Sequence, residues 1–281
     1  MRLKFKKTVI VGPGLIGGSI GIFLRKSGIA ASVVGVARHK STLSKALKKS
    51  AIDKAETDLK KAVIDADLVL IATPVEALKK IMREIKDSLK PGCIVFDVGS
   101  TKMEIVLQAQ KTLPRNVYFI GAHPMAGSEK TGAEFARGDL FKGSLCFITK
   151  TITTEKTALL KIKELWKRLG AKCVEIDPYV HDNIVASISH LPHLISAALV
   201  NSVPANYLKF AATGFKDTTR IAGGSPEIWH DIILSNRKAI LKQIEKFEAV
   251  LKKLKKSIVL KQGKQLTGQL QQAREKRQGI E

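Results

Sequence analysis

Short apolar runs alternate with amphipathic stretches over the N-terminal part of the 281-residue chain. Each apolar run ends at a glycine, a proline or a polar residue, which is typical of buried strands. The stretches between the runs repeat apolar residues three and four apart, which predicts helices. Strands are predicted at 7–11, 32–36, 68–73, 94–98, 117–121, 145–148 and 171–176, and helices at 15–27, 42–49, 75–89, 103–113 and 154–169. This alternation predicts an α/β fold, a Rossmann-type doubly wound parallel sheet.

The pattern changes at Asp177 and Pro178, after which helical spacing continues without convincing strands. The segment 181–203 is apolar almost all round and contains Pro192, which predicts a long, locally distorted helix buried on most sides. A lysine-rich amphipathic helix is predicted at 232–259. We therefore expect an all-helical second domain whose apolar helix suits the core of a homodimer. The predicted domains are residues 1–177 and 178–281.

The composition bears on the kind of partner. Lys and Arg number 48 and Asp and Glu 25, so the formal net charge is +23. Such a charge attracts polyanions, and nucleic acid is the first partner to consider. The chain is nevertheless 44% apolar, as packed proteins are, and its 5% aromatic content offers few platforms for stacking bases. We therefore predict a lysine-rich surface, with neither nucleic acid nor a membrane as partner.

The cysteines and the N-terminus bear on localisation. Cys93, Cys146 and Cys173 are odd in number and lack metal-ligand spacing, so neither a disulfide framework nor a zinc site is predicted. The apolar run 8–24 is interrupted by glycines and a proline and is short for a membrane span, which favours folded structure over a targeting segment. We expect a cytoplasmic protein.

The sequence Gly-Pro-Gly-Leu-Ile-Gly at 12–17 directly follows the first predicted strand and opens the first predicted helix. In this context the first glycine allows a tight turn, the second lets the backbone approach a pyrophosphate, and the third allows close packing of helix on strand. The amide groups of the helix N-terminus then bind phosphate. The dinucleotide contacts predicted from this motif are Gly12, Gly14, Leu15, Ile16 and Gly17.

The end of the second predicted strand lacks the acidic residue that binds the ribose hydroxyls of NAD. Ala37 is followed instead by Arg38, His39, Lys40 and Ser41, which would meet a 2′-phosphate with donors. We therefore predict NADP as the preferred cofactor, with NAD as the alternative, and Arg38 as the main contact, supported by His39 and Ser41. In the other interpretation, Arg38 stacks on adenine and both cofactors are used.

Ligands of such sheets bind beyond the carboxyl ends of the strands. This rule selects Thr73 and Pro74 at the end of the third predicted strand, Ser100 after the fourth and His123 after the fifth. An imidazole titrates near neutrality, and the proline after His123 stiffens the turn that presents it. His123 is therefore a candidate acid–base group, with a structural histidine as the alternative.

Two polar motifs stand out in the second domain. His190 and His193 lie three apart on one helix face, but no carboxylate or cysteine accompanies them, so no metal site is predicted. Arg220 ends a motif that begins at Gly214. Its guanidinium is suited to a bidentate pair with a substrate carboxylate, and a surface ion pair is the alternative.

Several of these motifs occur in the order found in the prephenate/arogenate dehydrogenases of tyrosine biosynthesis, which the chain resembles over about residues 7 to 260. The shared motifs are the glycine fingerprint, Asp-x-Gly-Ser-x-Lys at 97–102, Gly-x-His-Pro-Met-x-Gly at 121–127, Ser-His-Leu-Pro-His at 189–193, Gly-Phe-Lys-Asp-x-Thr-Arg at 214–220 and Pro-x-x-Trp at 226–229. Motifs in the right order are far more specific than any one alone.

The resemblance implies oxidative decarboxylation, in which a ring hydride passes to the nicotinamide and CO₂ leaves as the ring becomes aromatic. It implies that His123 is the catalytic histidine and that Ser100 holds the same substrate hydroxyl. It further implies that Arg220 binds a substrate carboxylate and that the helical domain forms a homodimer. The other residues expected at the substrate pocket are His190, His193, Lys216 and Trp229.

Two other functions stay open at this point. A β-hydroxyacid or 6-phosphogluconate-type dehydrogenase has similar domains and would use a catalytic lysine, for which Lys216 is the candidate. A nucleotide-sensing or nucleic-acid-binding Rossmann protein would explain the charge but leaves His123 and Arg220 without a role. The choice between prephenate and arogenate is also open, because an acid facing the substrate ammonium would favour arogenate, and Glu129 and Glu134 lie near His123 in sequence.

Overall fold

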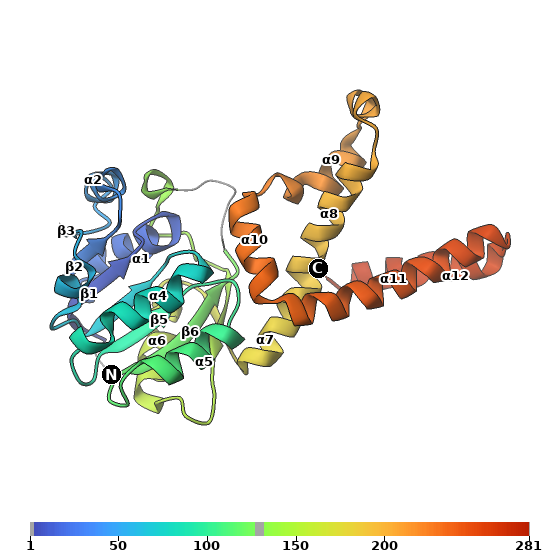
Figure 1. The fold of residues 1–281 in the computed structure, drawn as a ribbon. Coiled ribbons are helices and arrows are strands. Elements are labelled where there is room, and N and C mark those ends of the chain that lie inside the picture. Colours follow the sequence, from blue (N-terminus) through green and yellow to red (C-terminus); the bar gives the residue numbers. More distant parts are fainter. Residues whose placement is uncertain (1–2, 127–131, 281) are drawn as a thin grey trace.

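A computed structural model describes residues 3–126 and 132–280 of the chain. A sheet flanked by helices forms the N-terminal part, and the C-terminal part is helical (Figure 1). Gly127, the end of one predicted motif, and Glu129 lie outside the described residues.

The described strands form one sheet in the order β3-β2-β1-β4-β5-β6-β7-β8. They are β1 (Phe5–Val11), β2 (Ala30–Val36), β3 (Lys54–Glu56), β4 (Leu68–Ile71), β5 (Ile94–Asp97), β6 (Tyr118–Pro124), β7 (Leu145–Thr149) and β8 (Lys172–Ile176). The doubly wound fold is confirmed, but the sheet is mixed, because β7 pairs antiparallel with β6. Between these strands the described residues form only a short 3-10 helix at Ala133–Phe135 instead of a crossover helix, so β7 returns antiparallel.

Helices cover both faces of the sheet, as Figure 1 shows. They are α1 (Leu15–Lys26), α2 (Lys40–Lys48), α3 (Leu59–Val63), α4 (Val75–Ile85), α5 (Met103–Thr112) and α6 (Lys156–Arg168). Along β1, Val9 enters one apolar core and Ile10 the other, because successive side chains of a strand point to opposite faces. Both cores fix the strand ends at one edge of the sheet.

The helical part begins directly after the sheet. It contains α7 (Pro178–Val185), a π-helical turn (Ala186–His190), α8 (Leu191–Ser202), α9 (Thr213–Thr219), α10 (Pro226–Ser235), α11 (Arg237–Val259) and α12 (Gly263–Gln278). The distortion predicted near Pro192 is the π-helical turn just before it. The single helix predicted at 232–259 is divided at the buried Asn236, whose side chain bonds to α7 and to the π-helical turn.

The segment Pro178–Ser202 is long and apolar enough to cross a membrane, a test that core helices of soluble proteins also pass. It carries His181, Asp182, His190 and His193, all buried against other parts of the protein. Ionisable groups held in this way favour a helix that packs inside a protein over one that faces lipid. Only 28% of the most apolar stretch of this segment is buried and Ile188 is 60% exposed, so the predicted burial on most sides is not found within one subunit.

The packing of α6 on the sheet can be tested at Trp166. This side chain is fully buried, and its ring meets that of Phe141 edge-on with centroids 5.1 Å apart. We expect Trp166→Ala to lower the free energy of unfolding by about 3–5 kcal/mol in a urea titration, because it leaves a cavity. Leu160→Ala is the control on the same helix, where Leu160 is 50% exposed. An equally large loss in the control would contradict this placement of the core.

Candidate active site

The glycine turn between β1 and α1 has the predicted shape. Gly12 has φ +87°, and a Cβ there would lie 2.7 Å from the carbonyl oxygen of Ala72. A Cβ on Gly17 would lie 2.4 Å from the carbonyl oxygen of Gly12. At Gly14, by contrast, a Cβ would meet nothing within 4 Å, so open space adjoins the N-terminus of α1.

A cavity of about 420 Å³ extends from this space along the ends of β4, β5 and β6. Ile228, Asp231 and Ile232 of α10 also line it, so both parts of the chain contribute to its wall. The predicted site residues that line this cavity are Gly14, Leu15, Ile16, Thr73, Pro74, Ser100 and His123. The residues predicted from the strand ends therefore meet in one cavity, although they lie up to about a hundred positions apart in the sequence.

The cavity fits a dinucleotide cofactor on two observations. The open space at Gly14 leads to an α1 N-terminus that no side chain caps, so its amide groups are available to phosphate. The hydroxyl oxygen of Thr73 is buried in the cavity wall without a hydrogen-bond partner among the described residues. Such a buried polar atom is normally satisfied, and a bound ligand would satisfy it.

The residues predicted to contact the ribose lie at the adjacent end of β2. Arg38 and His39 occupy the loop before α2, Ser41 lies in the first turn of that helix, and all three are exposed. His39 precedes α2 without capping it through its side chain. Cationic side chains next to an uncapped helix N-terminus are an arrangement suited to an anion.

His123 lies in β6 with its ring against a buried histidine of α7. Its Nδ1 is 2.9 Å from Nε2 of His181, and Nδ1 of His181 is 2.8 Å from Oδ1 of Asp182. Burial, together with the nearby positive charge of Lys102, lowers the pKa of His123 well below its ordinary value. Burial also lowers the pKa of His181. The imidazole that faces the cavity is therefore neutral near pH 7 and able to accept a proton.

The carboxylate of Asp182 is held at the N-terminus of α5. It accepts hydrogen bonds from the backbone N–H groups of Lys102 at 2.8 Å and Met103 at 2.9 Å. The side chain of Lys102 is fully buried and forms an ion pair with Asp97, which also accepts a bond from the N–H of Gly99. The segment that carries Ser100 is thus fixed from both ends.

Among the predicted substrate residues of the helical part, His190 and His193 both contact Trp229. His193 stacks on Trp229 with ring centroids 3.5 Å apart, and its Nδ1 is buried without a partner among the described residues. His190 is buried and contacts the side-chain amide of Asn236 at 3.2 Å. Lys216 and Arg220 are exposed. None of these five predicted residues lines the 420 Å³ cavity.

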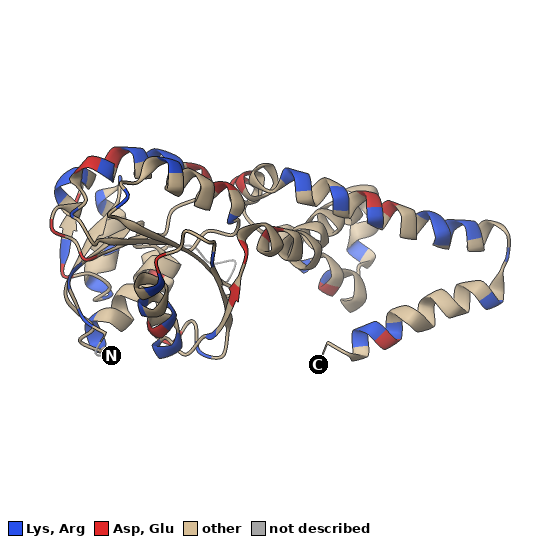
Figure 2. Cartoon of the chain, turned by 90° about the horizontal axis from the view of Figure 1, so that it is seen from below, with Lys and Arg blue, Asp and Glu red and all other residues tan. Residues whose placement is uncertain are grey.

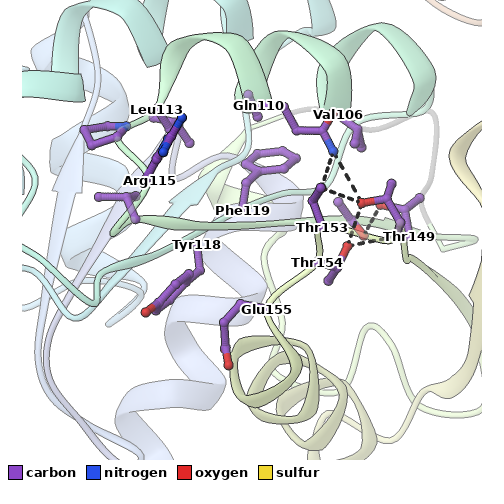
Figure 3. Close-up of a pocket in the computed structure, with 15 residues that line it drawn as sticks. Val106, Gln110, Leu113, Arg115, Tyr118, Phe119, Thr149, Thr153, Thr154 and Glu155 are labelled. Atoms are coloured by element: carbon purple, nitrogen blue, oxygen red, sulfur yellow. Dashed lines mark hydrogen bonds between the residues drawn. The ribbon is translucent and has the colours of Figure 1, made fainter.

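A larger cavity, of about 570 Å³, lies between α5 and the segment after β7 (Figure 3). No residue predicted for the site lines it. Its polar groups bond to one another, as when the Gln110 amide donates to the Thr153 hydroxyl at 2.8 Å. The smaller cavity, with its acid–base group and its unpartnered hydroxyl, is therefore the candidate active site.

Together, the fold and the cavity define the protein as one with a Rossmann-type domain, suited to a dinucleotide, and a helical domain that shares the same cavity. A family model described as the nucleotide-binding domain of prephenate dehydrogenase matches residues 20–175, and one described as its dimerization domain matches residues 177–272. The chain therefore belongs to the prephenate dehydrogenase family.

Individual relatives agree with this assignment. The chain is 34% identical to a prephenate dehydrogenase of Bacillus subtilis over 99% of its own length and 77% of that protein's. A crystal structure of prephenate dehydrogenase from A. aeolicus, in complex with hydroxyphenyl propionate and NAD⁺, matches with a TM-score of 0.93 and 32% identity over 99% of both chains. Synechocystis arogenate dehydrogenase matches with a TM-score of 0.85 and 32% identity, covering 98% of this chain and 100% of that one.

The sequence reasoning missed four residues that hold the site together. In the sequence Lys102 stands out only as part of a motif, and the local pattern does not mark His181, Asp182 or Asn236 as site residues. The adjacent His-Asp pair just after the last strand is a signal that was available. Its meaning depends on the docking of α7 against α5 and β6, which the sequence pattern does not reveal.

Burial of His190 predicts that stability depends on pH. Its pKa is lowered to about 4, whereas the unfolded value is near 6.5, so the unfolded chain binds the proton more tightly. Above pH 6.5 the group is neutral in both states and does not oppose folding. As the pH falls from 6.5 towards 4, the unfolded chain takes up the proton first and the free energy of unfolding decreases. We expect this group to contribute a loss of roughly 3 kcal/mol over that range in urea titrations.

The control for this prediction is His190→Asn. Its side-chain oxygen replaces Nδ1 as the acceptor for Asn236 but cannot titrate. The variant should therefore lose less stability between pH 6.5 and pH 4 than the wild-type protein. Equal losses in the two proteins would show that His190 is not the group responsible.

Proposed function

We propose that the chain is a prephenate and/or arogenate dehydrogenase that oxidatively decarboxylates a cyclohexadienyl substrate, giving 4-hydroxyphenylpyruvate or tyrosine. The observation that carries the proposal is the neutral, buried His123 in the same cavity wall as the glycine turn. The family assignment and the names of the two solved relatives support it. A nicotinamide cofactor bound there would accept the hydride.

The chain's own residues would act on the substrate hydroxyl. The imidazole of His123 accepts a hydrogen bond from the 4-hydroxyl and takes up its proton as the hydride leaves that carbon, which becomes carbonyl-like. Loss of the ring carboxylate as CO₂ then leaves its electron pair to make the ring aromatic, and the oxygen takes the proton back from the imidazolium. Ser100, which lines the same cavity, orients the hydroxyl. Residues of α10 line the same cavity, so the helical domain would contribute to the surroundings of the reacting carbon.

The carboxylates of the substrate would reach the helical domain. Arg220 opens a short 3-10 segment, Arg220–Gly223, and the next residue, Gly224, lies against the His193–Trp229 stack. We propose that Arg220 binds a substrate carboxylate beside that stack, with His190 and Lys216 at the same pocket. Glu134, one candidate for recognising the ammonium of arogenate, is paired with Lys45 at 2.8 Å, so its charge is already matched.

We also propose NADP as the preferred cofactor, with Arg38 on the 2′-phosphate and His39 and Ser41 beside it. The support is the absence of an acid after β2 and the uncapped N-terminus of α2. The structural relative solved with NAD⁺ does not decide the preference of this chain.

The organisation of the chain is proposed in the same way. Domains 1–177 and 178–281 fit the end of β8 at Ile176 and the start of α7 at Pro178. A homodimer through the helical domain fits the dimerization-domain match and the exposed apolar side of Pro178–Ser202. The free Cys93, Cys146 and Cys173 fit a reducing cytoplasm.

The alternatives have less support. Lys216, the catalytic lysine of the 6-phosphogluconate-type alternative, does not line the cavity at the glycine turn, where a catalytic group would have to meet the nicotinamide. Lys and Arg occur on helices of both domains, including α11 (Figure 2), which fits a generally basic surface better than a nucleic-acid site. Neither observation favours a second function.

The proposed activity is tested by supplying prephenate or arogenate with NADP or NAD and following the reduced cofactor. We expect turnover with at least one substrate, and a fall of about 10²-fold or more in kcat for His123→Asn. The asparagine amide can still donate to His181 but has no atom at the place of Nε2. His230→Asn, which removes an exposed histidine of α10, should keep full activity. Absence of turnover with both substrates would refute the proposal.

The cofactor preference is tested by Arg38→Gln. Losing a charge-assisted bond to the 2′-phosphate should raise the KM for NADP about 10-fold and leave that for NAD unchanged. Lys48→Gln, at the far end of α2, is the matched loss of charge and should change neither. A wild-type KM that is lower for NAD than for NADP would overturn the preference.

A further inference from the structure

We propose that His181 and Asp182 are positioning residues that hold His123 as the tautomer protonated on Nδ1, so that Nε2 is the acid–base atom in the cavity. This inference rests on the proposed function, because it concerns the same reaction. It assigns a role in the reaction to two buried residues of the helical part, His181 and Asp182.

The tautomers follow from the hydrogen-bond donors and acceptors. The carboxylate of Asp182 has only acceptors, so the 2.8 Å contact requires a proton on Nδ1 of His181. A neutral imidazole carries one proton, which makes Nε2 of His181 an acceptor. The 2.9 Å contact then requires a proton on Nδ1 of His123. The lone pair of His123 is therefore on Nε2.

The contacts of the His123 ring use Nδ1, which leaves Nε2 available to a ligand in the cavity. His123 lines the 420 Å³ cavity, and among the described residues its only hydrogen-bonded ring contact is the one through Nδ1. The ring of His181 is fully buried and meets Phe147 edge-on with centroids 5.3 Å apart. Packing of this kind prevents the ring of His181 from flipping, so it keeps its bonds to His123 on one side and to Asp182 on the other.

Asp182 is the last group of the His123–His181–Asp182 hydrogen-bond series and connects the two domains. Its oxygens accept bonds from amide groups at the start of α5, where the helix dipole favours a negative charge. Its backbone carbonyl accepts a bond from the Asn236 amide at 2.8 Å. The tautomer of His123 is therefore determined only when the helical domain is docked on the sheet domain.

The test compares His181→Leu with His181→Gln. Leucine removes the acceptor for His123, whereas the glutamine oxygen lies near the place of Nε2 and can accept the same bond. We expect kcat to fall about 10²-fold for the leucine variant, with the KM for substrate and cofactor unchanged, and to recover largely for the glutamine variant. Val185→Ala, a buried change in the same helix, should leave kcat unchanged.

The outcomes separate the two proposals. If the wild-type protein turns over and the leucine variant keeps its kcat, the positioning role is wrong and the proposed function stands. If the wild-type protein does not turn over either substrate, the proposed function itself fails.

A second measurement needs no substitution of His181. In protein labelled with ¹⁵N-histidine, the ring shifts of His123 should be those of a protonated Nδ1 and an unprotonated Nε2 near pH 7. The signal is assigned by its absence in His123→Asn. A proton found on Nε2 instead would overturn the inference even where the leucine variant does not fold.

Discussion

The carboxylate of Asp182 is the group on which both the docking of the domains and the candidate base depend. It accepts bonds from two backbone amides of the sheet domain and from Nδ1 of His181 in its own helix. Charge-assisted bonds of this kind are strong, and removing one partner of a buried charge costs about 3–5 kcal/mol. The two backbone amides belong to the sheet domain and the carboxylate to the helical domain. The bonds that dock the two domains therefore also hold His181 against His123.

The two apolar cores of the sheet domain hold the strand ends on which the helical domain docks. Successive residues of β1, β4 and β5 enter opposite cores, so each strand is packed on both faces and ends at a common edge. The glycine turn opens at this edge, and α10 covers it from the other domain. The cavity is therefore neither a feature of the sheet alone nor of the helices alone. Its wall combines a phosphate-binding turn with a desolvated imidazole, the two groups that the proposed oxidation requires.

The sequence pattern was sufficient to predict the elements that have a strong local signal, such as a glycine motif or a continuous apolar run. The glycine turn, the long apolar strands and the residues at their ends follow from spacing alone, which is why Gly14, Thr73 and His123 were predicted to converge. The edge strand β3 was missed because its three residues include a lysine and a glutamate in place of an apolar run. The break at Asn236 was missed because it depends on a bond to Asp182, 54 residues away. The partner of His123 is 58 residues distant, on another domain, and no local pattern reports such a pairing.

The central claim is that Nε2 of His123 faces the reacting hydroxyl in a cavity shared by both domains. A crystal structure of the protein with its nicotinamide cofactor and a 4-hydroxyphenyl product analogue tests it most directly. The account predicts the phenolic oxygen within about 2.6–3.2 Å of Nε2, with the His123–His181–Asp182 bonds intact. A phenolic oxygen bound away from His123, or a His123 ring turned so that Nδ1 faces the ligand, would contradict it.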